Sequence, residues 1–125
     1  FAIMSAPTTS QYGAIEAIKN GDSDIEMMVN EYNYRRRVIL QGFRDMGLDC
    51  FEPLGAFYVF PSIKSLGMSS GDFCEQLIKE QQVAVIPGDA FGDSGEGFIR
   101  CSYAYSIDAI SKALERIEKF VRQHK

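Results

Sequence analysis

The sequence predicts an α/β (α+β) fold in which a short, mainly antiparallel sheet is packed against helices. Apolar residues recur at helical spacing in four segments, and four short apolar stretches bounded by glycine, proline or polar residues lie between them. The predicted order of elements is α-α-β-β-α-β-β-α. With 125 residues, of which 46% are hydrophobic, the chain is long enough to bury a core.

Two helices are predicted at the start of the chain. The first carries apolar residues at 14–18 and ends at Asn20-Gly21, where glycine tolerates a left-handed terminus. The second begins at Ser23, which forms a capping-box pattern with Glu26, and its apolar period continues to Met46. About 23 residues at about 1.5 Å each give a rod of about 35 Å, a length that often bridges two bodies.

Four strands are predicted in the remainder of the chain. Residues 48–52 and 56–60 form a hairpin joined at 53–55, residues 83–86 form the third strand, and residues 98–103 form the fourth.

Two further helices are predicted, each with a serine at its N-terminus. Ser69 or Ser70 caps the third helix, which buries Phe73, Leu77 and Ile78. Ser106 caps the last helix, whose inward residues are Ile107, Ile110, Leu114, Ile117 and Val121.

Composition argues against several classes of partner. The net charge of −4 disfavours nucleic-acid binding. The three cysteines are scattered and the single histidine lies in the tail, so we expect no metal site, no disulfide framework, and free thiols in a reducing cytoplasm. No apolar run approaches the length of a membrane span, so we expect no membrane contact. Residues 1–4 are apolar and no methionine stands at the head of the chain, which suggests part of a longer protein.

Arg100 is the one side chain that the pattern singles out for binding. Alternation along residues 98–103 places it on the face opposite Ile99, Cys101 and Tyr103. A guanidinium can bind a carboxylate through two parallel hydrogen bonds. From the pattern alone, a carboxylate-binding arginine and a solvated strand arginine both remain open.

The glycine-rich loop at residues 87–97 precedes this strand. It lacks the lysine of a phosphate-binding P-loop, and its acids Asp89, Asp93 and Glu96 do not have the spacing of a calcium-binding EF-hand. A tight irregular turn shaped by glycine is the favoured interpretation. No catalytic residue is assigned, because the sequence holds neither a Ser-His-Asp set nor a pair of carboxylates placed by spacing.

Several stretches together resemble a known family. These are SAPTTSQYGAIEAIKNG at 5–21, GAFYVFP at 55–61 and VAVIPGDAFGDSGEGFIRCSYA at 83–104. They resemble the C-terminal part of the fold-type I, class I/II aminotransferases that depend on pyridoxal phosphate, with the aspartate and aromatic branch nearest. The most specific piece, PG-x-x-FG-x-x-G-x-GFIR, runs from Pro87 to Arg100.

The resemblance implies a role for each part of the chain. Arg100 would bind the α-carboxylate of the substrate, residues 1–21 would end the large cofactor-binding domain, and residues 22–125 would form the small domain with an inter-domain helix at about 23–46. The lysine that holds pyridoxal phosphate would lie upstream, so this chain alone should neither bind the cofactor nor catalyse. Its partners would be the missing N-terminal large domain, a second subunit in a homodimer, and amino acid and 2-oxo acid substrates.

Three functions remain open at this stage. The first is transfer of an amino group between an amino acid and a 2-oxo acid. The second is elimination by a pyridoxal-phosphate-dependent carbon–sulfur β-lyase of the same fold. The third is a non-catalytic small-molecule-binding α/β module.

Overall fold

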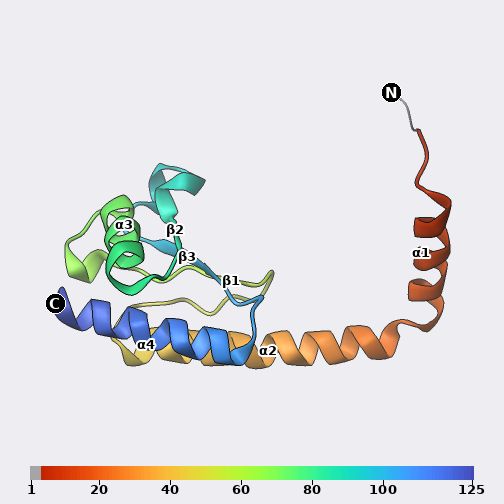
Figure 1. Cartoon of the computed structure of the whole chain (residues 1–125), viewed down its shortest axis with the longest axis horizontal. Helices are drawn as coiled ribbons and strands as arrows, with labels where there is room; N and C mark the ends of the chain where they lie inside the picture. Colours follow the sequence, from red (N-terminus) through yellow and green to blue (C-terminus); the bar gives the residue numbers. More distant parts are fainter. Residues whose placement is uncertain (1–3) are drawn as a thin grey trace. The chain divides into compact units, whose positions relative to one another are not determined.

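The computed structural model describes residues 4–125 and divides the chain into two compact units, residues 1–31 and 32–125. Residues 1–3, on which the suggestion of a longer protein partly rests, lie outside the described residues. Helix α1 (Thr8–Asn20) belongs to the first unit, and helix α2 (Asp22–Asp45) begins there (Figure 1). Neither α1 nor the first turns of α2 bury a residue.

Two details of the first unit differ from the sequence-based expectation. Gly21 has φ −87°, so it is not left-handed, and its Cα hydrogens instead allow a close approach to Ala17, whose carbonyl oxygen would lie 2.4 Å from an added Cβ. Helix α2 begins at Asp22, so Ser23 lies inside the first turn and does not occupy the N-cap position. The backbone carbonyl of Gly21 accepts a hydrogen bond from the Ile25 amide at 3.0 Å.

The second unit is built on two helices that run side by side, the C-terminal half of α2 and helix α4 (Ile107–Gln123) (Figure 1). They meet at Gly42, where an added Cβ would lie 2.6 Å from the Leu114 side chain. Helix α3 (Ser70–Gln81) packs on α4 through an edge-to-face contact of Phe73 and Phe120, whose ring centroids are 5.1 Å apart. Edge-to-face pairs of this kind are a favoured aromatic geometry.

Three short antiparallel strands complete the second unit, which confirms the predicted fold class. Strands β1 (Tyr58–Val59) and β2 (Ile86–Pro87) pair with opposite edges of the central strand β3 (Ile99–Ser102), giving the order β1-β3-β2. An isolated bridge between Ser62 and Phe98 extends the β1 side.

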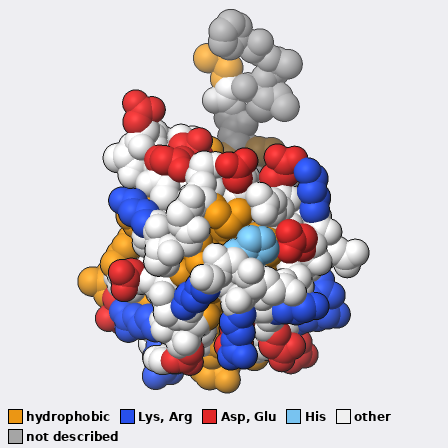
Figure 2. Space-filling model, turned by 90° about the vertical axis from the view of Figure 1, so that its left-hand side faces the viewer, with side chains coloured by type: hydrophobic (Ala, Val, Ile, Leu, Met, Phe, Trp, Pro, Cys, Tyr) orange, Lys and Arg blue, Asp and Glu red, His pale blue; other side chains and the backbone are white. Residues whose placement is uncertain are grey.

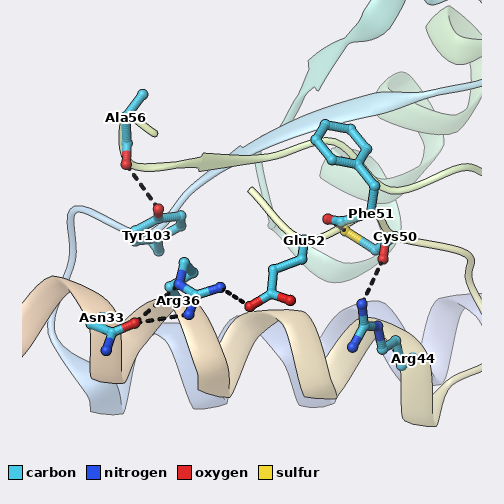
Figure 3. A network of polar contacts seen from close by, with 8 residues as sticks. All are labelled: Asn33, Arg36, Arg44, Cys50, Phe51, Glu52, Ala56 and Tyr103. Atoms are coloured by element: carbon cyan, nitrogen blue, oxygen red, sulfur yellow. Dashed lines mark hydrogen bonds and ion pairs between the residues drawn. The ribbon is translucent and has the colours of Figure 1, made fainter. Parts of the chain in front are cut away.

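The predicted hairpin is wrong, because residues 48–52 form no strand. Side chains from α2 hold this segment instead: Arg44 donates to the Cys50 carbonyl at 3.2 Å, and Arg36 donates to the Glu52 carboxylate at 2.5 Å (Figure 3). The Arg36 hydrogen bond and charge hold the pKa of the Glu52 carboxyl below its usual value. The backbone of the segment is bonded outside any ladder, because the Asp49 carbonyl accepts from the Ser62 amide at 2.7 Å and the Cys50 carbonyl accepts from Arg44. Strand β1 therefore pairs with β3 rather than with its neighbour in sequence.

The predicted third strand is also shorter than expected. Only Ile86 of residues 83–86 pairs with β3, opposite Arg100, and the pairing then continues at Pro87 opposite Ile99.

The hydrophobic core joins α2, α3, α4 and the sheet. Both predicted caps are present, since Ser69 accepts from the Asp72 amide and Ser106 accepts from the Ala109 amide. Ile78 was expected inside but is 51% exposed, because α3 faces α4 along Phe73 and Leu77. The core is formed by Ile39, Leu40, Phe43, Met46, Leu48, Cys50, Val59, Ile63, Phe73, Leu77, Ile99, Cys101, Tyr103, Ile110, Ile117, Phe120 and Val121.

Candidate functional site

Arg100 lies on β3 as the alternation predicted. Ile99, Cys101 and Tyr103 are buried on the core side, with exposed fractions of 0%, 6% and 2%, whereas Arg100 is half-buried. The period of two in the strand therefore orients this arginine away from the core.

Two aromatic rings contact the Arg100 guanidinium. Its Cζ lies 4.4 Å from the centroid of the Tyr58 ring, which belongs to β1, and 4.2 Å from the centroid of the Phe91 ring, which belongs to the glycine-rich loop. Both distances are within the range of cation–π attraction. Among residues 4–125 no carboxylate pairs with Arg100, and its N–H groups donate to no protein acceptor. The guanidinium is thus held by rings while its five donors stay available.

An open groove of about 650 Å³ borders Arg100. Most of its lining is apolar and comes from α2, residues 83–86 and α4, and Tyr58, Ser102 and Lys112 also border it. This space lets a small molecule approach the strand that carries the arginine.

The loop before β3 is the tight irregular turn that the sequence predicted. It consists of two short 3₁₀ helices, Gly88–Phe91 and Asp93–Gly95. Gly88 and Gly95 approach so closely that a Cβ on Gly88 would lie 2.2 Å from the Gly95 carbonyl oxygen, a contact only glycine permits. The Gly88 amide donates to the Phe98 carbonyl at 2.9 Å and so closes the loop onto the start of β3.

Ser70 anchors this loop to α3, a role that the sequence did not reveal. Its side chain is fully buried, and its hydroxyl oxygen accepts from the amides of Gly97 at 2.8 Å and Phe98 at 3.2 Å. In return, the Glu96 carboxylate accepts from the Ser70 amide at 2.9 Å. The sequence suggested Ser70 only as an alternative helix cap, and the cap is Ser69. Ser70 and Glu96 are 26 residues apart, so no local sequence pattern could have predicted this contact.

Replacing Ser70 by alanine is expected to lower the free energy of unfolding by about 1–3 kcal/mol, because two amides of the loop lose their acceptor where water is scarce. Urea unfolding of the full-length protein measures the change. Ser94→Ala, the same substitution at an exposed position of the same loop, is the control and should change stability by less than about 0.5 kcal/mol. Equal stability of the two variants would contradict the anchoring role.

The three cysteines are free thiols with no sign of catalytic activation. Burial raises the pKa of the Cys101 and Cys50 thiols, and burial, followed by the charge of Asp89, raises the pKa of Cys74 to about 11. A reactive cysteine needs the opposite shift, since the thiolate is the nucleophile. Within the described residues no cluster of histidine, cysteine or carboxylate side chains could hold a metal ion.

The surface shows no segregation of charge on the face viewed in Figure 2, where basic side chains are interspersed with acidic ones. Among the helices of residues 4–125, none combines the length and the apolar character needed to cross a membrane.

Comparison with known proteins decides the family. The family described as aminotransferase class I and II matches residues 2–117 of this chain. The chain belongs to the class I and II aminotransferases. This membership confirms the resemblance carried by the motif that ends at Arg100.

Curated relatives in the family are much longer than this chain. The chain is 49% identical over 123 residues to YugH, an aminotransferase-family protein of Bacillus subtilis, covering 98% of this chain and 32% of the relative. It is 42% identical over 120 residues to aromatic-amino-acid aminotransferase 2 of Thermococcus litoralis, covering 94% of this chain and 31% of that enzyme. The chain therefore spans about a third of the length of the aminotransferases it matches.

Solved aminotransferases share the same fold over this region. An aromatic aminotransferase from Pyrococcus horikoshii superposes with a TM-score of 0.86 at 41% identity, covering 90% of this chain and 31% of that one. An aspartate aminotransferase from Thermus thermophilus, solved with maleate, gives a TM-score of 0.83 at 34% identity, covering 92% and 30%.

Proposed function

We propose that this chain is the C-terminal part of a pyridoxal-phosphate-dependent aminotransferase that moves an amino group between an amino acid and a 2-oxo acid, with Arg100 binding the substrate α-carboxylate. The observation that carries the proposal is the state of Arg100 at the end of the family motif. It is half-buried, contacts two rings, and has no carboxylate partner within residues 4–125. A cation kept without an anion beside open space is suited to bind one.

The names of the relatives support a carboxylate as the shared feature of the ligand. One relative is named for aromatic amino acids and another for aspartate, and one solved structure contains the dicarboxylate maleate. Aromatic and acidic amino acids differ in their side chains but share the α-carboxylate. Arg100 is thus assigned to the part of the substrate that all members of the class have in common.

The described residues do not themselves fit pyridoxal phosphate. The cofactor needs a lysine that reaches into an enclosed site, but all six lysines here are exposed, and Lys79 pairs with Glu75 while Lys125 donates to the Met46 carbonyl. We therefore assign the cofactor and its lysine to the part of the relatives that this chain does not span. In the full-length protein, Arg100 would bind and orient the substrate, and proton transfer would belong to residues elsewhere.

The exposed apolar residues of the first unit support a domain assignment. Helix α1 carries large apolar residues but buries none of them: Tyr12 is 71% exposed and Ile18 is 82% exposed. Met27 and Val29, in the N-terminal half of α2, are also largely exposed. Several large apolar side chains left exposed on neighbouring segments often contact another body. We assign residues 1–21 to the end of a large cofactor-binding domain, residues 22–125 to the small domain, and the complete enzyme to a homodimer.

An absorbance spectrum of the full-length protein tests this function. We expect a visible band from the bound cofactor that changes when an amino acid is added, with a 2-oxo acid as product. Release of ammonia with the 2-oxo acid would instead indicate the carbon–sulfur lyase. A protein without a chromophore that still binds a small carboxylate would indicate the non-catalytic binding module.

A further inference from the structure

We propose that Tyr58 and Phe91, here called the aromatic bracket, are positioning residues that hold the Arg100 guanidinium ready for a carboxylate. This inference rests on the proposed role of Arg100 and extends it to two side chains from separate segments.

The sheet register places Tyr58 beside Arg100. Tyr58 pairs with Ser102 across the β1–β3 ladder, so Arg100 is its diagonal neighbour two residues away on the central strand. Diagonal neighbours on one face of a sheet lie within reach of long and aromatic side chains. The 4.4 Å separation of the Tyr58 ring centroid from Cζ of Arg100 follows from this register.

The glycine-rich loop places Phe91 against the same guanidinium. Phe91 ends the first 3₁₀ helix of the loop, and its ring contacts Phe60 edge-to-face at 6.3 Å. Phe60 in turn stacks on Phe98 at 5.6 Å, directly before β3. Because the Gly88 amide also bonds to Phe98, the loop that carries Phe91 is tied to the strand that carries Arg100.

The chemistry of the contact explains why rings suit this task better than an acid would. An aromatic face attracts a cation through its quadrupole but competes only weakly for the N–H donors of the guanidinium. A neighbouring carboxylate would occupy those donors. The loop contains Asp89, Asp93 and Glu96, yet none of them pairs with Arg100, and Glu96 bonds to Ser70 instead. The bracket orders the side chain and leaves its donors for the ligand.

Loss of either ring should therefore weaken carboxylate binding without changing the chemical step. Without the bracket, the Arg100 side chain loses rotamer freedom when the ligand binds, and this loss of entropy lowers the affinity. We expect Tyr58→Leu and Phe91→Leu each to raise the dissociation constant of a carboxylate by about three- to tenfold. The value of kcat at saturating substrate should stay within about twofold.

The test uses the full-length protein and two carboxylates that lack an amino group, maleate and 3-phenylpropionate, in calorimetric titrations. The ring-conserving variants Tyr58→Phe and Phe91→Tyr should bind like the wild type, which separates a role of the ring from a role of the fold. Phe51→Leu replaces a phenylalanine that is 64% exposed and outside the bracket, and it should have no effect. Thermal unfolding of each variant checks that it is folded.

A double-mutant cycle in kcat/KM supplies the readout that a merely structural role would not produce. If the bracket acts through Arg100, adding Phe91→Leu to Arg100→Ala should cause no further loss. A further loss equal to the one that Phe91→Leu causes in the wild type would overturn the bracket and leave the role of Arg100 intact. The same conclusion would follow if the leucine variants bound carboxylates like the wild type while Arg100→Ala bound them poorly. Unchanged carboxylate binding in Arg100→Ala would overturn the proposed function and the bracket with it.

Discussion

Replacing Arg100 by alanine in the full-length protein is expected to lower kcat/KM for its amino acid substrate by about 100-fold or more. Two charge-assisted hydrogen bonds to a carboxylate contribute about 1.5–3 kcal/mol each, and every 1.4 kcal/mol is a factor of about ten. The loss should fall mainly on KM, with cofactor absorbance unchanged. Steady-state kinetics with a saturating 2-oxo acid measure it.

Two further variants sharpen this result. Arg100→Lys keeps the charge but not the planar pair of donors, so its activity should lie between those of the wild type and Arg100→Ala. Arg122→Ala removes an exposed arginine of α4 that pairs with Glu118, and it should leave kcat/KM unchanged. Wild-type kcat/KM in Arg100→Ala would rule out the assignment of this side chain to the α-carboxylate.

Replacing Gly88 by alanine is expected to lower the free energy of unfolding by about 2–3 kcal/mol or more, because the methyl group meets backbone rather than a movable side chain. Its Cβ would lie 2.2 Å from the carbonyl oxygen of Gly95 and 2.8 Å from that of Phe98. Relief of this clash requires the loop to open, which would also displace Phe91 from Arg100. The free energy of unfolding, measured in urea, and kcat/KM should therefore both decrease.

Gly71→Ala is the matched control for this change. Gly71 lies in the first turn of α3, and an added Cβ there meets nothing within 4 Å. Alanine is the better helix former, so this variant should be neutral or more stable by up to about 1 kcal/mol. Stability of Gly88→Ala equal to that of Gly71→Ala would show that the loop tolerates a side chain at its closest approach.

Most helices and the orientation of Arg100 could be predicted from the sequence because both depend on local periodicity. Helix α4 begins after Ser106, and Arg100 faces away from Ile99 and Cys101, as their spacing indicated. The absence of the expected hairpin at 48–60 could not be predicted, because the Glu52 carboxylate and the Cys50 carbonyl are bonded to Arg36 and Arg44 of a helix earlier in the chain. Those bonds depend on how α2 packs against residues 48–52, which a local apolar pattern does not predict.

The sequence by itself determined the family, the fold class and the arginine that the motif ends on. Only the tertiary structure decided what surrounds that arginine, because Tyr58, Phe91 and Arg100 come from three segments with no shared period. The same holds for Ser70, whose buried hydroxyl orders a loop 27 residues away. Local spacing fixes the direction in which a side chain points from its own element, and packing between distant elements fixes what it meets there.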